Sequence, residues 1–425
     1  MSARTTLIRN VRILDPASGR DEIGSLLFSE AILDIGPRVE ASDADVIDGA
    51  GLALMPGLID MRVVIGEPGA EHKETFKSAG RAAAAGGVTT LVQMPNTTPV
   101  IDDQSLVDFV LRRGPARTGV RILPAAALTK GLEGEAMTEI GLLAEAGAVM
   151  FSNGDRQIAD SRVLRRALAY ATTFNALVAH RPEDPYLAAG GVMNEGELAA
   201  RLGLPGIPAA AEVIMAERDL ALAELTGGRL LLDMLSSAHT LEPLRRAKAR
   251  GVNAFASVSV HHLTLNELDV DGYRTFAKLS PPLRSETDRV ALGAAVQDGL
   301  IDVIVSGHDP RPAEDKRLPF DEAAFGATAL ETLLPGILSL HHNGGAPLLP
   351  LLKAVTQRPA ELLGLPQGRL AKGAPADLIL VDLGKPYRLD SEKLLSKSKN
   401  SPFDEKLLQG MVQRTFVGGK TVYPS

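Results

Sequence analysis

The sequence predicts an α/β protein in which a (β/α)8 TIM barrel is joined to a small β-sandwich. From Gly57 onward, apolar runs of five to eight residues alternate with helical segments, as in repeated βα units around a parallel sheet. Short strands separated by turn residues occur at both ends of the chain. The chain has 425 residues, and single cores stop growing at roughly 250 to 300 residues, so the barrel is expected to carry an accessory part.

The β-sandwich is predicted from the two ends of the chain. Residues 6–13, 24–28 and 31–35 read as short strands, and strands return after Leu365 at 376–382 and 412–417. No Pro/Gly/Ser-rich tether separates them from the middle of the chain, so the two ends are expected to pair with each other. This predicts three parts: residues 1–55 and 365–425 form the sandwich, and residues 56–364 form the barrel.

The middle of the chain supplies eight candidate barrel strands with helices between them. Helical stretches end at glycine and pass directly into a buried strand, as at Ala85-Gly86-Gly87-Val88. In such barrels the chemistry lies at the carboxyl ends of the strands. The predicted strands are 57–65, 88–95, 121–128, 148–152, 176–181, 229–235, 252–258 and 302–307. The predicted helices include 73–86, 104–113, 160–174, 239–250 and 285–298.

Composition excludes several classes of function. The net charge of -7 argues against a nucleic-acid-binding surface, which needs clustered basic residues. The chain has no cysteine, so a metal would need His, Asp, Glu or a modified Lys, and a cytoplasmic location is expected. Met1 to Ile8 lack the pattern of an export signal, and no run of about 18 apolar residues predicts a membrane span.

Several motifs identify a family resemblance. Pro56-Gly57-Leu58-Ile59-Asp60-Met61 with Glu67-Pro68-Gly69, Ala85 to Thr90 with Gln93 to Thr97, and Leu128 to Leu132 resemble the first three strand ends of dihydroorotases and allantoinases in the amidohydrolase superfamily. Further matches continue in order to the C-terminus, including Pro281-Pro282-Leu283-Arg284 and Ser396 to Phe403. The chain most resembles the catalytically inactive dihydroorotase-like subunits of some bacterial aspartate transcarbamoylases. The resemblance implies a barrel of the metal-dependent hydrolase type.

The resemblance also implies a chemistry. In this family one or two divalent metals, zinc among them, lower the pKa of a water and polarise a cyclic amide, while an aspartate moves the proton. The family has His-x-His-x-Arg after the residues that match Asp60 and Met61. This chain has Arg62, Val64 and Gly66 at those three positions. Both first-strand ligands and a substrate-binding arginine are therefore absent.

Three further family positions differ. Asn153 stands at a bridging-ligand position, Met234 at a histidine-ligand position and Gly307 at the position of the catalytic aspartate. A catalytic zinc ordinarily takes three protein ligands, and among the matching positions only His180 is retained. No catalytic residue, metal or other cofactor is therefore expected. The expected remnant of the substrate pocket is Asn96, His180 and Arg62.

A shifted metal site is the alternative to this loss. It would use His180 with Asp60, Asp233, His308 or Asp309. Because successive side chains of a strand point to opposite faces, Asp233 beside Met234 and His308 beside Gly307 are expected to point away from the site.

His261 and His262 are expected to pack in the core with their ring nitrogens bonded.

Arg62 has two interpretations. Its guanidinium could sit near the vacated metal position and offset the remaining carboxylates, or it could point out of the barrel mouth into solvent. The first predicts that Arg62 lies within hydrogen-bonding reach of a carboxylate such as Asp60 or Asp309.

A preserved fold with altered chemistry predicts a role for the shape alone. We expect a non-catalytic dihydroorotase homologue that acts as a structural or assembly partner of the aspartate transcarbamoylase catalytic subunit in pyrimidine biosynthesis, with self-association as a second expectation. The alternative is an active or weakly active dihydroorotase, or another cyclic amidohydrolase, with an atypical metal site. A third option is a pocket that binds a small ligand through Asn96 and Arg62 without hydrolysing it.

Overall fold

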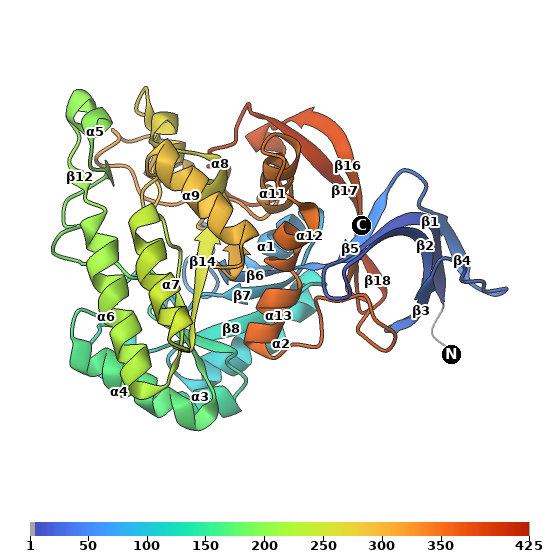
Figure 1. Ribbon diagram of the computed structural model, residues 1–425, viewed down its shortest axis with the longest axis horizontal. Coiled ribbons are helices and arrows are strands. Elements are labelled where there is room, and N and C mark those ends of the chain that lie inside the picture. The colour runs from blue at the N-terminus through green and yellow to red at the C-terminus, as the bar shows by residue number, and fades with distance from the viewer. Residues whose placement is uncertain (1–4, 425) are drawn as a thin grey trace.

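The barrel is an eight-stranded parallel sheet. The structure, a computed structural model, describes residues 5–424. The strands follow one another around the sheet in chain order, and all eight predicted strands are present (Figure 1). A bridge between Val63 and His308 closes the circle, with the Val64 N–H donating to the His308 carbonyl at 2.8 Å. The barrel strands are β6 (Leu58–Val63), β7 (Val88–Gln93), β8 (Arg121–Ala127), β9 (Met150–Ser152), β10 (Leu177–His180), β13 (Arg229–Leu232), β14 (Ala254–Ser259) and β15 (Val303–Val305).

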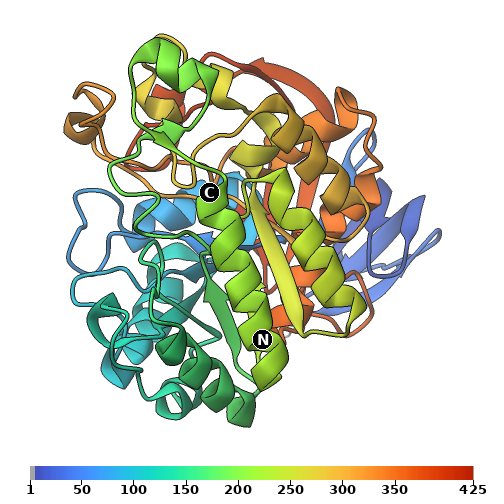
Figure 2. The same cartoon turned by 60° about the vertical axis from the view of Figure 1, so that its left-hand side comes forward.

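Helices cover the outside of the barrel (Figures 1 and 2). Several begin at a capping side chain: Thr75 and Ser285 form capping boxes, and Asp103 and Asp160 accept from the first turn. All five predicted helical stretches contain a helix. These are α1 (Phe76–Ala85), α2 (Gln104–Thr118), α4 (Ser161–Ala171), α7 (Leu241–Ala249) and α9 (Glu286–Gln297).

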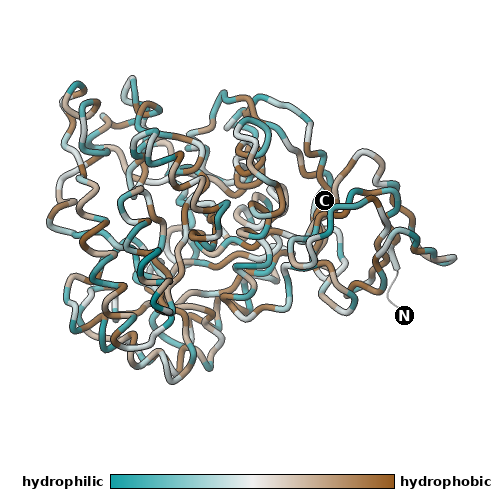
Figure 3. The backbone as a smooth tube through the Cα atoms, in the orientation of Figure 1, coloured by the Kyte–Doolittle hydropathy of each residue, from teal (hydrophilic) through white to brown (hydrophobic). Residues whose placement is uncertain are grey.

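Further helices complete the barrel layer and its loops. Hydrophobic residues run along the barrel strands, whereas the outer helices alternate between hydrophobic and hydrophilic residues (Figure 3). The remaining α-helices are α3 (Ile140–Glu145), α5 (Glu197–Leu202), α6 (Ala210–Thr226), α8 (Val260–Thr264), α10 (Ala313–Lys316), α11 (Leu333–His342), α12 (Leu348–Lys353) and α13 (Gln357–Leu363). Short 3₁₀ turns lie at Lys130–Leu132, Thr172–Phe174, Ala238–Thr240, Glu267–Val270, Thr275–Ala277 and Ser391–Lys393. Among residues 5–424, none of the helices has both the length and the apolar composition needed to cross a bilayer.

The two chain ends build one curved sheet beside the barrel, which folds into the predicted β-sandwich (Figure 1). Its order is β18-β17-β16-β5-β1-β2-β3, with β4 paired to β1. Phe28 from the N-terminal part meets Phe416 from the C-terminal part edge to face, with ring centroids 5.2 Å apart. The strands are β1 (Thr6–Asp15), β2 (Arg20–Phe28), β3 (Ile32–Gly36), β4 (Asp45–Asp48), β5 (Ala53–Pro56), β16 (Leu378–Arg388), β17 (Leu407–Val417) and β18 (Lys420–Tyr423).

The sandwich and the barrel share a hydrophobic core. Met55, Ile379 and Val412 of the sandwich sheet are buried in the same apolar cluster as the alanines of α1. The Thr415 hydroxyl donates to the Ala84 carbonyl at 2.7 Å and fixes β17 to this helix. A separate pair of short strands, β11 (Met193–Asn194) and β12 (Gly206–Ile207), brackets α5 in the excursion that follows β10.

Candidate functional site

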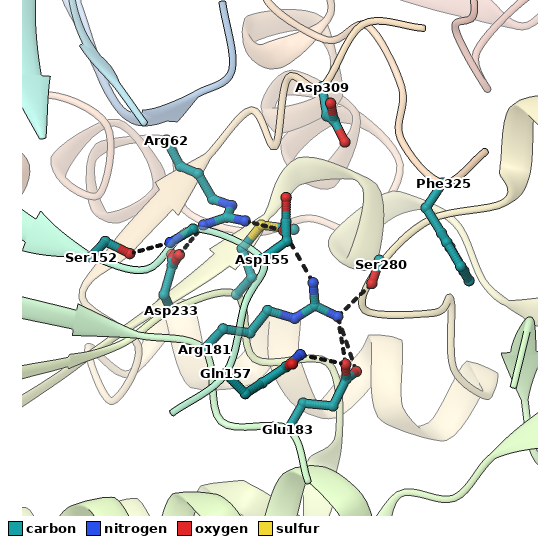
Figure 4. A network of polar contacts seen from close by, with 12 residues as sticks. Arg62, Ser152, Asp155, Gln157, Arg181, Glu183, Asp233, Ser280, Asp309 and Phe325 are labelled. Atoms are coloured by element: carbon teal, nitrogen blue, oxygen red, sulfur yellow. Dashed lines mark hydrogen bonds and ion pairs between the residues drawn. The ribbon is translucent and has the colours of Figure 1, made fainter. Parts of the chain in front are cut away.

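A buried arginine lies at the centre of the barrel mouth, where the carboxyl ends of the strands converge (Figure 4). Arg62, near the end of β6, is 4% exposed. One of its terminal nitrogens donates to Asp233 Oδ2, and the other donates to Asp155 Oδ1 at 2.5 Å. The second oxygen of Asp233 accepts from the Ser257 hydroxyl at 2.8 Å. Arg62 therefore links the ends of β6, β9 and β13 through two carboxylates.

The carboxylates that contact Arg62 are not the two expected, Asp60 and Asp309. Arg62 pairs with Asp233 and Asp155 rather than with the side chains of Asp60 or Asp309, and it does not point into solvent. Asp60 instead accepts the backbone N–H groups of Arg62 and Ser306 at 3.2 and 3.1 Å. Burial raises the pKa of Asp60 to about 6.

The expectation that Asp233 points away from the site is wrong, because Asp233 faces Arg62. The alternation rule fails because Asp233 lies beyond the end of its strand at Leu232, next to Met234 with a left-handed φ of 59°. His308 borders the cavity at the mouth, but its Nδ1 accepts from the Ala329 N–H at 3.0 Å and its Nε2 lies 3.6 Å from Glu74 Oε2. The expectation for His308 therefore stays a prediction.

A second buried arginine extends the network (Figure 4). Arg181, directly after β10, donates to Asp155 at 3.1 Å, to both oxygens of Glu183 at 3.0 Å and to the Ser280 hydroxyl at 2.5 Å. Gln157 also donates to Glu183, at 2.8 Å. The Asp155 carboxylate is thus shared between two guanidinium groups.

The charges at the mouth shift one another's pKa values. Burial alone lowers the pKa of Arg62, but the Asp233 and Asp155 carboxylates outweigh it and raise that pKa above its ordinary value. Burial raises the pKa of Asp155, but the nearby arginines lower it by more, so the pKa lies below its ordinary value. For Asp309, burial prevails over Arg311 and raises the pKa, with the Asp155 charge adding to the effect. Asp309 therefore holds a proton more readily than Asp155 does.

Two small cavities lie at the mouth. One of about 20 Å³ is bordered by Arg62, Asp155, Ser280 and Asp309, among others. That volume accommodates about one water molecule. The other, of about 110 Å³, is lined by Lys73, Asn96 and Arg311 and shares Asp309 with the first. Among residues 5–424, the buried Asn96 Oδ1 has no hydrogen-bond partner, so an acceptor is available beside the larger cavity.

His180, the retained family ligand, has both ring nitrogens engaged. Its Nδ1 lies 2.6 Å from Asp219 Oδ2, and its Nε2 accepts from the Ile158 backbone N–H at 3.0 Å. A neutral imidazole has one donor and one acceptor nitrogen, and both are used here. The lone pair that would bind a metal is therefore already occupied.

The other family ligand positions contribute no donor. Asn153 is turned toward Thr129, with its oxygen accepting from the backbone N–H at 3.0 Å and its nitrogen donating to the hydroxyl at 2.7 Å. A Cβ added at Gly307 would lie 3.1 Å from Ser259 Cβ and 3.5 Å from Met234 Cε. The position of the family's aspartate is therefore filled by neighbouring side chains.

The residues at the mouth do not fit the metal that the family uses. Within residues 5–424, no group of three or more His, Asp or Glu side chains is arranged to hold a cation. A zinc site needs about three protein donors with free lone pairs. Here the carboxylates of Asp155 and Asp233 are bonded to Arg62, and no step through a metal is assigned to this site.

The remaining histidines at the mouth are buried. His262 is bonded at both nitrogens, by Ser259 and the Pro281 carbonyl, as predicted for core packing. His261 stacks on Phe403, but within the described part of the chain its Nε2 has no hydrogen-bond partner, which differs from the prediction. Burial lowers the pKa of His261 to about 3 and that of His262 to about 4. Both rings are therefore neutral near pH 7.

Three site residues were missed by sequence reasoning. Asp155, Arg181 and Glu183 carry much of the network, yet none had an assigned role. Asp155 and Arg181 directly follow the matched positions Asn153-Gly154 and His180, so their place at strand ends was the available signal. Glu183 had no comparable motif.

Comparisons with known proteins agree with this architecture. Residues 51–240 match the family model described as dihydro-orotase-like, and residues 199–422 match the model of the amidohydrolase family. A dihydroorotase from Wolbachia sp. subsp. Drosophila simulans (strain wRi) is 41% identical over 97% of this chain and 94% of its own length. A dihydroorotase from Syntrophus aciditrophicus (strain SB) is 39% identical over 98% of this chain and 99% of its own length.

Solved structures give the same fold. The L-hydantoinase (dihydropyrimidinase) from Arthrobacter aurescens superposes with a TM-score of 0.87 at 25% identity, over 98% of this chain and 95% of that one. The dihydropyrimidinase from Brevibacillus agri NCHU1002 superposes with a TM-score of 0.85 at 21% identity and supports the fold alone.

These findings overturn one expectation. The chain was predicted to be a non-catalytic structural partner of aspartate transcarbamoylase. The full-length relatives at about 40% identity bear the name of an enzyme, and none of these findings points to an inert subunit. The prediction failed because changed ligand positions were read as loss of activity, a step that the residues alone do not justify. The expected contact with a transcarbamoylase is untested and stays a prediction.

Proposed function

Since this chain belongs to the dihydroorotase-like branch of the amidohydrolase family, we propose that it is a cyclic amide hydrolase of the dihydroorotase type with an atypical site. The observation that carries the proposal is the identity of about 40% to proteins named dihydroorotase over nearly the whole chain. The proposed substrate is dihydroorotate, a small ring that carries a carboxylate. A cytoplasmic location remains part of the prediction.

The geometry supports a position for each reactant. A water in the cavity of about 20 Å³ would lie beside Asp155 and Asp309. Asp309, with its raised pKa, is our candidate for the group that takes the proton of this water and returns it to the ring nitrogen as the C–N bond breaks. Arg62 and Arg181 would stabilise negative charge developing on the amide oxygen. In the adjoining cavity, Lys73 and Arg311 offer positive charge to the ring carboxylate, and Asn96 Oδ1 offers an acceptor.

The test measures ring opening of dihydroorotate by chromatography of the N-carbamoyl acid that forms. Wild type should show turnover above the uncatalysed rate, and Asp309→Asn should lower kcat by about 100-fold or more if this carboxylate moves the proton. Glu314→Gln, an exposed position on the same segment, serves as the matched control and should leave kcat unchanged. Absence of turnover in the wild type, with and without added divalent cations, would refute the proposal.

A second candidate is binding of the same ring without hydrolysis. It is favoured by the lack of a three-donor metal group in the described part of the chain. Calorimetric titration with dihydroorotate distinguishes the two functions, because binding heat without product formation supports the second candidate and excludes the first.

A further inference from the structure

We propose that Arg62 takes the place of a metal as the fixed positive charge of the barrel mouth, so that the native protein binds no divalent cation there. The inference concerns how the charges of this site are balanced. It does not depend on the proposed hydrolysis, because neither of its readouts is turnover.

The contacts of Arg62 support this substitution. Its guanidinium is planar and carries several N–H donors in a fixed arrangement, so it can donate to two carboxylate oxygens at once. The oxygens that it uses, Asp233 Oδ2 and Asp155 Oδ1, come from two different strand ends. A metal at the centre would have to displace Arg62 from these same oxygens.

Burial makes the positive charge necessary. The Asp233 side chain is 3% exposed, and an ionised carboxylate at that depth is costly without a counter-charge. The Ser257 hydroxyl satisfies its other oxygen but carries no charge. Among the described residues, the cation in contact with Asp233 is Arg62, whose own side chain is 5% exposed. Each buried charge therefore depends on the other.

The charges around Arg62 disfavour a second cation. Arg181 contacts the same oxygen of Asp155 as Arg62, and Arg311 pairs with Asp309 at 2.7 Å. A divalent ion placed beside these guanidinium groups would be repelled by them. His180 has no free lone pair to compensate, since its Nε2 accepts from Ile158.

The first experiment measures metal content and thermal stability of the wild type. Protein is produced in zinc-supplemented medium, purified without chelator and analysed by elemental mass spectrometry. We expect far less than one metal per chain, and the same Tm with zinc and with EDTA. One zinc per chain, together with a Tm that falls on chelation, would overturn the inference.

The second experiment tests the charge balance by substitution. Arg62→Met leaves Asp233 buried without its cation and should lower Tm by about 5 °C. The double variant Arg62→Met/Asp233→Asn removes both charges and should recover most of that loss. Arg112→Met, at a side chain that is 81% exposed, is the control and should not change Tm. Equal Tm values for Arg62→Met and Arg112→Met would contradict the inference. If Arg62→Met does not fold, the double variant and the wild-type metal analysis still decide.

Discussion

At the scale of single residues, backbone conformation decided what the sequence could and could not predict. A carboxylate partner for Arg62 was foreseen, but the partner itself was not. Strand periodicity placed Asp233 on the wrong face, because Met234 adopts a left-handed φ of 59° beyond the end of β13. A non-glycine residue in that region is uncommon, and nothing in the sequence signals it.

Gly307 gives a test at the same scale. Gly307→Asp restores the side chain that the family carries, yet it should not create a working site, because the new Cβ would lie 3.1 Å from Ser259 Cβ. We expect the free energy of unfolding to fall by about 1 to 3 kcal/mol through overpacking, with no rise in ring-opening activity. Urea denaturation and the chromatographic assay measure the two effects.

The control for Gly307→Asp is Gly272→Asp. Gly272 has a similar φ of 74°, but a Cβ added there would have no atom of residues 5–424 within 4 Å, so only backbone strain should remain. Equal losses of stability in the two variants would show that the crowding around Gly307 is unimportant.

At the scale of elements, the loop of residues 394–403 is held across the barrel by two glutamates, the buried Glu74 and the half-buried Glu331. Glu331 Oε1 accepts from the Leu395 and Ser396 backbone N–H groups at 2.6 and 3.2 Å, and Glu74 accepts from the Ser396 hydroxyl. In the sequence this segment is recognisable only as a family motif. These contacts could not be predicted, because Glu74 and Glu331 lie far from residues 394–403 along the chain.

The contact of Glu331 with this loop predicts a pH dependence of stability. Burial raises the pKa of Glu331 to about 7, from an ordinary value of 4.5. Between these values the folded chain binds more protons than the unfolded chain, so the stabilising contribution is complete below about pH 4.5 and is lost as pH rises through 7. Glu331→Gln keeps an oxygen for both N–H groups and removes this loss. From pH 4.5 to 8 the variant should gain about 2 to 3 kcal/mol relative to the wild type in urea unfolding.

Glu392→Gln, on an exposed side chain of the preceding turn, is the comparison for Glu331→Gln. It should follow the wild-type pH profile. A Glu331→Gln profile parallel to that of the wild type would mean that this carboxyl does not titrate in the folded protein near neutral pH.

Strands were easier to predict than helices. The eight barrel strands are short apolar runs bounded by turn residues, and each was found within a few residues. The 17-residue helix α6 was absent from the predicted helices. Its buried face includes Glu212 and Asp219, so its polar residues do not mark a solvent-facing side. Those charges are bonded inside the protein, to Ser236 and His180 among others, which sequence alone does not reveal.

At the scale of the whole molecule, the two chain ends share a hydrophobic core with the barrel, so we expect them to unfold together. Phe416→Ala should remove the contact with Phe28 and lower the free energy of unfolding by about 3 to 5 kcal/mol. Because Val412 on the same strand is buried with the helix α1, calorimetry should show one transition that moves to lower temperature. Phe174→Ala, at a residue 36% exposed, should shift it far less. A separate early transition would show that the sandwich unfolds independently.

The closing edge of the barrel differs from its other seven junctions. Ladders of paired residues join neighbouring strands elsewhere, but β15 and β6 meet through the Val63–His308 bridge and the Asp60 carboxylate that accepts the Ser306 N–H. Ala354 and Val355 are inserted between them and accept from Ile304 and Ile59. The barrel is therefore a ring with one seam. Its amide protons at this edge should exchange with deuterated solvent sooner than those of the ladders.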